Sequence, residues 1–358
     1  MNQTLRRCGV SLAMASLLVA CGGGSDDDDY SRVVNFGDSL SDAGTYAVTE
    51  VAASGGGRFT INGPGVQLWT DLLADEVGVA APCPAEKGLN SDPAFLTPVM
   101  PPVPQPDCYN YAQGGSRVTE PIGPNNRALQ ALGNPTGALG HLTVPLVTQV
   151  SRHLAKGNGR FGDDELVTVL AGGNDLFINL AAVDAAAMQP GATQQSVDAA
   201  VQAALVAMGT AGAQLATLIE EQTVAKGAER VVLVNLPDAS LTPSARQESP
   251  QTQALIRRMT TTFNTQLQAG MNGVNEVLVV DAFAQSQDQA ANPGRYELDN
   301  VSDGACTSSL GSWNCTQATL IAGDTSRYLF ADDVHPTPYG HFLIADAVLT
   351  ALARRGWL

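Results

Sequence analysis

The chain has 358 residues, with 35 acidic and 19 basic side chains, a formal net charge of -16 and a sequence pI near 4.5. Nucleic acids and anionic lipid surfaces are bound by clustered Lys and Arg, so this balance argues against both as electrostatic partners. The length suits a single α/β domain with long loops. Such a domain can bury a core large enough to be stable without disulfides or metal ions.

The N-terminal segment has the pattern of an export signal. Two arginines at positions 6 and 7 precede an apolar stretch from Val10 to Ala20, which is too short to cross a bilayer as a permanent helix. The sequence Leu18-Val19-Ala20-Cys21 resembles a bacterial lipobox, in which Cys21 is acylated and becomes the mature N-terminus. Ordinary cleavage beside an incidental cysteine is the alternative.

This pattern predicts the organisation of the whole chain. We expect residues 1–21 to be a lipoprotein signal peptide, residues 22–30 a flexible Gly- and Asp-rich tether, and residues 31–358 one domain. Gly22, rather than Asp, follows Cys21, as in lipoproteins that are sent on to an outer membrane. The expected product is an exported bacterial outer-membrane lipoprotein held by an N-terminal lipid anchor, and ordinary secretion is the alternative.

Five short runs rich in Val, Leu and Tyr are mostly continuous in their apolar character, as strands covered on both faces are. They are Arg32–Phe36, Tyr109–Ala112, Leu166–Leu170, Arg230–Asn235 and Glu276–Asp281. Helical patterns lie among them at residues 66–77, 146–154, about 195–226, 250–271 and 336–353, the last two beginning with proline. This alternation predicts crossover units in a doubly wound α/β fold with a parallel sheet of about five strands.

Four cysteines remain after the leader, namely Cys83, Cys108, Cys306 and Cys315. An even number in a chain bound for an oxidising compartment predicts two disulfides. Four cysteines allow three pairings, and the local pairs Cys83 with Cys108 and Cys306 with Cys315 would close short loops without crossing the core. No Cys-x-x-Cys pair and no nearby His supports a zinc site, so we expect no metal. The proline-rich segment 81–106 is expected to be a long ordered loop.

Residue types suited to acyl transfer occur at both ends of the chain. Ser39 lies in Phe36-Gly37-Asp38-Ser39-Leu40-Ser41-Asp42, directly after the first expected strand, and His335 lies in Asp332-Asp333-Val334-His335-Pro336. A serine hydroxyl is a weak nucleophile that needs a neighbouring base, and a carboxylate can orient the imidazole that serves as that base. Because ligands of an open parallel sheet bind beyond the carboxyl ends of its strands, residues that follow different strands can meet there.

Two further stretches, Asn110-Tyr111-Ala112-Gln113-Gly114-Gly115 and Gly172-Gly173-Asn174-Asp175, complete a set of four motifs. Their identity and order resemble the GDSL, or SGNH, family of serine esterases and lipases, over the chain from Val33 to about His341. The resemblance implies a three-layer, flavodoxin-like fold and a reaction without a cofactor. It assigns Ser39 as nucleophile, His335 as base and Asp332 as the carboxylate that orients it.

The same resemblance implies an oxyanion hole with three donors: the backbone N–H of Ser39, the backbone N–H of Gly115 and the side-chain amide of Asn174. Each has a plainer alternative, since turn glycines and helix-capping asparagines are common, and Gly114 is an adjacent rival. Asp333 rivals Asp332, although the family spacing favours Asp332. The absence of Gly-x-Ser-x-Gly from the chain disfavours the α/β-hydrolase fold.

The remaining acidic and histidine side chains near these motifs are expected to be structural. Asp38 and Asp42 should accept hydrogen bonds from backbone donors around the serine turn. His141, His153 and His341 lack an aspartate three residues earlier, so they are expected at the surface or as satisfied structural histidines.

The predicted function is a serine hydrolase that cleaves the carboxylic ester of a small molecule or lipid through an acyl-enzyme on Ser39. Acyl transfer to an alcohol is the close alternative, and a non-catalytic surface lipoprotein that binds a partner is the distant one. The loops expected to shape the acyl pocket are 45–65, 81–106 and 299–324. They contain scattered aromatic residues and no stripe that identifies one substrate, so short acyl esters, phospholipids and acetylated polysaccharides all stay open.

Overall fold

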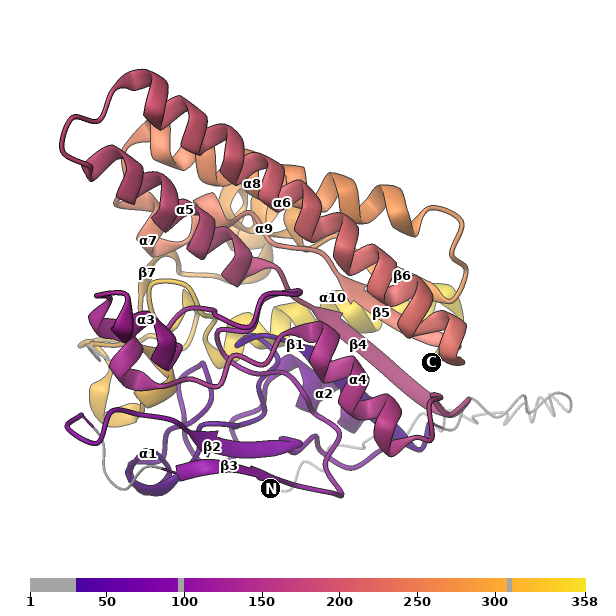
Figure 1. The fold of residues 1–358 in the computed structure, drawn as a ribbon. Coiled ribbons are helices and arrows are strands. Elements are labelled where there is room, and N and C mark those ends of the chain that lie inside the picture. Colours follow the sequence, from indigo (N-terminus) through magenta and orange to yellow (C-terminus); the bar gives the residue numbers. More distant parts are fainter. Residues whose placement is uncertain (1–29, 96–99, 308–310) are drawn as a thin grey trace, which may run out of the picture.

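A computed structural model describes residues 30–95, 100–307 and 311–358 and has a parallel sheet between helical layers (Figure 1). The sheet consists of β1 (Arg32–Gly37), β4 (Glu165–Leu170), β5 (Arg230–Val234) and β6 (Val277–Val280), which neighbour one another in that order. The predicted doubly wound α/β fold is confirmed. All carboxyl ends of the strands point to the same edge of the sheet, because every pair is parallel.

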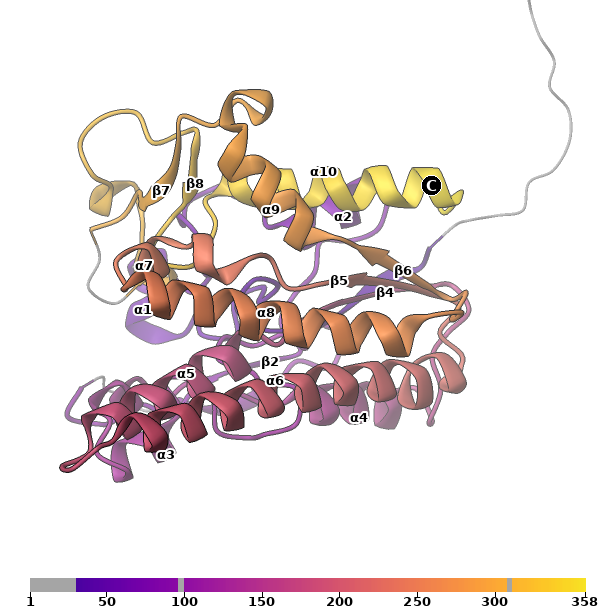
Figure 2. The ribbon, with the colours of Figure 1, turned by 90° about the horizontal axis from the view of Figure 1, so that it is seen from above.

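The strands are covered on both faces, as their continuous apolar runs predict. Along each strand, alternate side chains enter one of two clusters. Figure 2 shows the helices that lie on the two sides of the sheet. One cluster includes residues of α4 (Leu146–Lys156), α5 (Gly173–Met188), α6 (Gln194–Gln222) and α8 (Pro250–Met271). The other includes residues of α2 (Trp69–Glu76), α10 (Pro338–Arg355) and the start of α9 (Ala282–Ala291).

The segment Tyr109–Ala112, predicted as a fifth strand, is not a strand in the structure, which corrects the prediction. The segment lies beside β1 and forms two isolated parallel bridges, from Asn110 to Asn35 of β1 and from Asn110 to Pro84 on its other side. Asn35 N–H donates to Tyr109 O at 3.1 Å and Tyr111 N–H donates to Asn35 O at 2.8 Å. The ladder is then interrupted, because Gly37 N–H donates to Gln149 Oε1 at 2.9 Å instead of to this segment, and only the bond from Gln113 N–H to Gly37 O at 3.2 Å continues it.

The predicted helices lie close to their expected positions, and capping side chains explain the differences. Helix α8 has the predicted bounds, with Ser249 as its N-cap and Pro250 in its first turn. Helix α10 begins at Pro338 instead of the expected Pro336, because the Thr337 side chain caps it by accepting from Gly340 N–H at 3.0 Å. Helices α5 and α9 are additional to the prediction.

Shorter elements lie in the loops that connect the main strands and helices. They are the helices α1 (Thr49–Ala53), α3 (Arg127–Ala131) and α7 (Pro243–Arg246), and the single turns η1 (Pro135–Leu139), η2 (Val224–Lys226), η3 (Ala239–Leu241), η4 (Pro293–Tyr296), η5 (Ser312–Asn314) and η6 (Gln317–Thr319). The segment 81–106, expected to be a loop without strands, contains the antiparallel pair β2 (Glu86–Leu89) and β3 (Met100–Pro104). Strands β7 (Asn300–Gly304) and β8 (Tyr328–Phe330) form a separate parallel pair.

Both local disulfides are present, joining Cys83 to Cys108 and Cys306 to Cys315. The signal peptide, Cys21 and most of the tether lie outside the described residues. Tyr30, expected to end the tether, instead belongs to the domain: its ring is buried and its hydroxyl donates to Trp357 O at 2.9 Å.

The long helix α6 is apolar enough, by length and composition, to cross a membrane, but here it packs its buried face along α8 and α5. The closest approach is at Gly212. A Cβ atom built there would lie 2.3 Å from the backbone oxygen of Phe263 in α8. Gly209, one turn earlier, has space for a Cβ, whose nearest neighbours would be side-chain atoms at 3.4 and 3.6 Å.

We therefore predict opposite effects for two matched substitutions in α6. Gly212→Ala should lower the free energy of unfolding by about 1–3 kcal/mol, because the two helix backbones must separate to admit a methyl group. Gly209→Ala should be neutral or raise it by up to about 1 kcal/mol through helix propensity. Urea unfolding followed by circular dichroism measures both, and equal effects would contradict the close packing of α6 on α8.

Candidate active site

Ser39 lies in a tight turn directly beyond the carboxyl end of β1. Asp38 N–H donates to Leu170 O at 3.3 Å, which continues the parallel ladder one residue past β1. The Asp38 side chain and backbone then accept from the N–H groups of Leu40 and Ser41, both at 3.1 Å. This turn fixes Ser39 at the rim of the sheet, where only 9% of the residue is exposed.

His335 and Asp332 reach Ser39 from the loop between β8 and α10. His335 Nε2 lies 2.9 Å from Ser39 Oγ, and His335 Nδ1 lies 2.9 and 3.0 Å from the two carboxylate oxygens of Asp332. The predicted residues Ser39, His335 and Asp332 are therefore joined in one continuous line of hydrogen bonds, from Ser39 Oγ through the His335 ring to the Asp332 carboxylate. Asp333, the rival carboxylate, is exposed, and its backbone oxygen accepts from Ser244 N–H.

The carboxylate of Asp332 is held by the backbone on several sides. Its oxygens accept from the N–H groups of Ser312, Val334 and His335 at 2.7, 2.8 and 2.6 Å. Burial alone would raise the pKa of Asp332, but the attraction of His335 and these hydrogen bonds outweigh burial and hold the pKa well below its ordinary value. The group is thus an anion at neutral pH.

The imidazole of His335 shows the reciprocal effect. Burial alone would lower the pKa of His335, but the charge and hydrogen bond of Asp332 outweigh burial and raise the pKa above its ordinary 6.5. Because Asp332 accepts from Nδ1–H, the neutral ring presents an unprotonated Nε2 to the Ser39 hydroxyl. The arrangement can therefore take a proton from Ser39 Oγ.

Hydrogen-bond donors lie next to this line. Within the described residues, the N–H groups of Ser39 and Gly115 donate to no protein acceptor. Gly114, the rival of Gly115, differs because its N–H donates to Asp42 Oδ2 at 2.9 Å. The Asn174 amide uses one N–H to bind Ser116 O at 2.8 Å, which holds this side chain beside the glycine segment and leaves its second N–H available.

Asp42 and Gln149 tie the serine turn to neighbouring segments. Asp42 accepts from the N–H groups of Gly44 and Thr45 in its own turn, at 2.9 and 2.7 Å, as well as from Gly114. The Gln149 amide of α4 makes paired bonds to the N–H and C=O of Gly37, both at 2.9 Å. The role of Gln149 was not predicted, although a polar side chain on an otherwise apolar helix face signals a buried hydrogen-bonding role.

The two aspartates of the serine turn are buried and have unusual pKa values. Burial raises the pKa of Asp38 to about 7, and the bond from Leu40 N–H and the attraction of His335 offset only part of this effect. Burial likewise raises the pKa of Asp42 to about 6, against hydrogen bonds from three backbone N–H groups. The expected acceptor roles are confirmed, and both groups change charge nearer neutrality than an ordinary aspartate.

The other three histidines are all buried, which rules out the surface alternative of the prediction and leaves the structural one. His153 Nε2 lies 3.1 Å from Glu165 Oε2, whereas its Nδ1 is buried without a hydrogen-bond partner among the described residues. His141 stacks on Tyr46 with ring centroids 4.2 Å apart, and burial lowers the pKa values of His141 and His341 to about 3. Both rings are therefore neutral at physiological pH.

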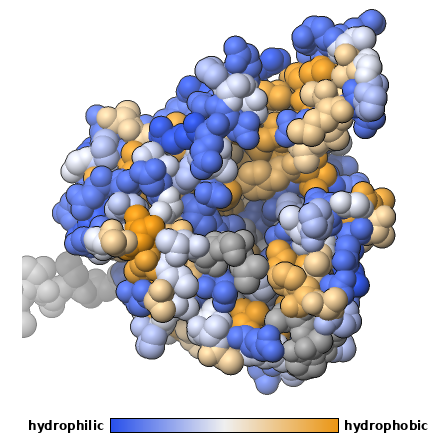
Figure 3. Space-filling model, turned by 90° about the vertical axis from the view of Figure 1, so that its left-hand side faces the viewer, coloured by the Kyte–Doolittle hydropathy of each residue, from blue (hydrophilic) through white to orange (hydrophobic). Residues whose placement is uncertain are grey.

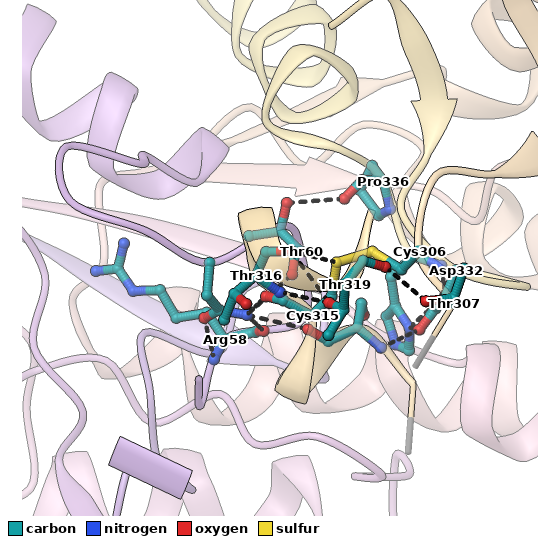
Figure 4. The surroundings of a disulfide bond; sticks show 12 residues. Arg58, Thr60, Cys306, Thr307, Cys315, Thr316, Thr319, Asp332 and Pro336 are labelled. Carbon is teal, nitrogen blue, oxygen red and sulfur yellow. Dashed lines mark hydrogen bonds and ion pairs between the residues drawn. A yellow bond between two sulfur atoms is a disulfide. The ribbon is translucent and has the colours of Figure 1, made fainter. Parts of the chain in front are cut away.

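The disulfide between Cys306 and Cys315 lies beside the Asp332 loop (Figure 4). Cys306 N–H donates to Ala331 O at 2.8 Å, and the same disulfide-closed loop supplies the Ser312 N–H that binds Asp332. Across the loop, the Thr60 hydroxyl donates to Pro336 O at 2.9 Å. The disulfide thus restrains the segment that holds the Asp332 carboxylate.

An apolar pocket opens beside Ser39 and contains about 1150 Å³ of empty space, including its mouth. The strand ends Leu170 and Val234 form its floor, and α5, the η3 region, α9, β8 and α10 form its walls. This end of the molecule is hollowed, with hydrophobic side chains on the wall of the hollow (Figure 3). The expectation that loops 45–65, 81–106 and 299–324 shape the pocket is wrong, because only Val301 of these loops contributes to the lining.

Comparison with known proteins places this chain in a family. The model of the family described as GDSL-like lipase/acylhydrolase matches residues 33–348. An uncharacterized protein of the trpE-trpG intergenic region of Pseudomonas putida is 28% identical over 356 residues, covering 95% of this chain and 52% of that protein. Lipase 1 of Photorhabdus luminescens is 23% identical, with coverages of 90% and 50%. Esterase EstA of Pseudomonas aeruginosa is 28% identical, with coverages of 90% and 47%. The chain spans about half the length of these curated relatives.

Similar solved structures carry lipase titles. Phospholipase A1 from Streptomyces albidoflavus NA297 aligns with a TM-score of 0.47 at 15% identity, covering 91% of this chain and 99% of that one. An extracellular lipase from Streptomyces rimosus aligns with a TM-score of 0.43 at 15% identity, covering 90% and 99%.

The electrostatics of the site predict how His335 titrates. NMR of histidine-labelled protein should give His335 a pKa above 6.5, because protonation is favoured beside the Asp332 anion. Asp332→Asn should move this pKa down, since a neutral amide no longer stabilises the imidazolium. The matched control Asp333→Asn should leave it in place, because that side chain is exposed. If the pKa of His335 moved down in Asp333→Asn and not in Asp332→Asn, Asp333 would be the carboxylate partner of His335 and the assignment of Asp332 would be wrong.

Proposed function

The chain belongs to the GDSL-like lipase/acylhydrolase family, and we propose that it hydrolyses carboxylic esters through an acyl-enzyme formed on Ser39. The observation that carries this proposal is the continuous line from Ser39 Oγ through His335 to Asp332, with contacts of 2.9 to 3.0 Å. Such a line supplies a nucleophile, a base within reach of its proton and an anion that orients the base.

In the first half of the reaction, Ser39 Oγ attacks the ester carbonyl while His335 Nε2 accepts the hydroxyl proton. The new Oγ–C bond makes a tetrahedral intermediate with a negatively charged oxygen. His335 then returns its proton to the ester oxygen as the C–O bond breaks and the alcohol leaves. In the second half, water attacks the acyl-enzyme with the same proton transfers, which releases the acid and restores Ser39.

The negative oxygen of the intermediate requires donors that are in place before the reaction. We assign these to the N–H groups of Ser39 and Gly115 and to the Asn174 side-chain amide. Support comes from the two backbone N–H groups, which lack an acceptor among the described residues, and from the bond to Ser116 O that holds the amide. Loss of one such donor typically costs about 3 kcal/mol in the barrier, and a preorganised donor needs no rearrangement.

We also propose that the enzyme is exported and carries lipid on Cys21. The lipobox-like sequence ending at Cys21 supports the modification. Two disulfides within the domain support folding in an oxidising compartment, since such bonds are rare in the reducing cytosol. Acylation at Cys21 would hold the domain near a membrane through the tether, with Gly22 favouring the outer membrane.

The proposed mechanism predicts that Ser39→Ala lowers kcat for p-nitrophenyl acetate by about 10⁴- to 10⁶-fold without changing the thermal unfolding midpoint. The hydroxyl is needed only for chemistry, because Ser39 lies at the rim and its Oγ bonds no residue but His335 in the described structure. Ser41→Ala is the matched control. The Ser41 hydroxyl lies in the same turn, and the variant enzyme should hydrolyse the ester near the wild-type rate. Wild-type activity in Ser39→Ala would refute the assignment of the nucleophile.

A further inference from the structure

The pocket beside Ser39 contains one polar side chain whose presence the proposed reaction does not explain. Gln289, in α9, faces this pocket and is only 6% exposed. Within the described residues, its amide makes no hydrogen bond with the protein. Its amide atoms are not among the fully buried ones, so they reach the pocket, where a polar group of a ligand can replace water as their hydrogen-bond partner.

The other polar side chains at the α9 end of the lining have partners in the protein. The Gln285 amide donates to Leu343 O at 2.9 Å, and the Ser286 hydroxyl donates to Phe283 O at 2.9 Å. Thr242 Oγ1 donates to Ala239 O at 2.9 Å. The carboxylates and amides at positions 38, 174 and 238 are likewise bonded. Gln289 therefore differs from its neighbours, and its amide is available to whatever fills the pocket.

The position of α9 relates Gln289 to the reacting serine. Ser39 follows β1 at one side of the sheet, and α9 begins after β6 at the other, three strand spacings or about 14 Å across the sheet edge. Gln289 lies about two turns beyond the start of α9, on the wall of the same pocket. The pocket runs between them over the ends of β4 and β5, where its lining is Leu170, Val234 and Leu236. An acyl chain attached to Ser39 would thus cross an apolar floor before it meets the α9 wall.

The geometry of an extended acyl chain converts the distance across the pocket into a number of carbon atoms. Each C–C bond of about 1.5 Å advances an extended chain by about 1.25 Å, so about 14 Å corresponds to roughly ten carbons. A shorter chain would leave the α9 wall unfilled. A much longer chain would have to bend or leave through the mouth of the pocket.

Resting on the proposed ester hydrolysis, we propose that the pocket binds a medium-length acyl chain of about ten carbons that carries a hydroxyl group near its far end, and that Gln289 recognises this hydroxyl. The apolar floor accounts for the chain, and the unpaired amide accounts for the hydroxyl. A site built to hydrogen-bond a substrate group discriminates against the analogue that lacks it, because the site is then left with an unpaired polar group.

A matched pair of esters tests this proposal on the wild-type enzyme. The p-nitrophenyl esters of decanoic acid and 10-hydroxydecanoic acid differ only in the terminal hydroxyl, and 3-hydroxydecanoate places it close to the carbonyl. We expect kcat/KM to be about three- to tenfold higher for the 10-hydroxy ester than for decanoate, as one additional hydrogen bond provides. The 3-hydroxy ester should show no such gain.

Two variants assign the preference to Gln289. Gln289→Leu should abolish or reverse the ratio between the 10-hydroxy ester and decanoate, because an apolar side chain completes the apolar wall. The control Gln287→Leu makes the same change on the same helix at a position outside the pocket lining, and should keep the wild-type ratio. It removes an amide that donates to Asp238 Oδ2, so it also controls for a general loosening of α9.

The possible outcomes separate this inference from the function on which it rests. If wild type cleaves neither p-nitrophenyl acetate nor either decanoate ester, the proposed hydrolysis itself is wrong. If wild type cleaves acetate and treats decanoate and 10-hydroxydecanoate alike, the hydrolysis stands and the role of Gln289 is wrong. A hydroxyl preference that survives in Gln289→Leu would also overturn that role. Should this variant not fold, the wild-type ratio alone still decides whether the pocket recognises the hydroxyl.

Discussion

The 2.9 Å hydrogen bond between Ser39 Oγ and His335 Nε2 joins residues 296 positions apart in the chain, and the surrounding structure holds both of its ends. On the serine side, the ladder from β1 to β4 continues to Asp38, and the Gln149 amide binds both backbone groups of Gly37. On the histidine side, Asp332 is fixed by three backbone N–H groups, one of them from the disulfide-closed loop. The fold thus restrains a contact that neither segment could make alone.

Holding these groups together has a cost in stability. Asp38 and Asp42 have folded-state pKa values of about 7 and about 6, against 3.8 for an ordinary aspartate. Between pH 4 and pH 7 the folded chain therefore binds more protons at these sites than the unfolded chain, and their contribution falls as pH rises through this window. Burial beside the serine turn keeps their hydrogen bonds to backbone donors and at the same time makes their charged forms unfavourable. A destabilising cluster of this kind is typical of functional sites.

The fold class and the disulfide pairs could be predicted because each depends on a local signal, whereas the roles of Ser39, His335 and Asp332 were implied by the resemblance of four motifs to the GDSL family. Continuous apolar runs indicated the buried strands, and the cysteine spacing left the local pairs as the simplest choice. The segment Tyr109–Ala112, predicted as a fifth strand, shows the limit of such signals, since its composition does not reveal that the Gln149 amide binds the Gly37 N–H that would continue the pairing. The pocket depends on helices α5 and α9, which carry no clear period in the sequence, and on the order of the strands. The roles of Gln149 and Gln289 could not be predicted, because they depend on where the helix faces that carry these residues lie in the fold.

Our central proposal is that Ser39 attacks an ester whose oxyanion is received by Ser39 N–H, Gly115 N–H and the Asn174 amide, while the acyl chain enters the pocket below α9. A crystal structure of the enzyme inhibited with a p-nitrophenyl alkylphosphonate tests these elements together. We expect phosphorus bonded to Ser39 Oγ, one phosphoryl oxygen about 2.7–3.1 Å from the three donors, and the alkyl chain over Leu170 and Val234. Phosphorus on another residue, or a phosphoryl oxygen turned away from Gly115 and Asn174, would contradict the proposal.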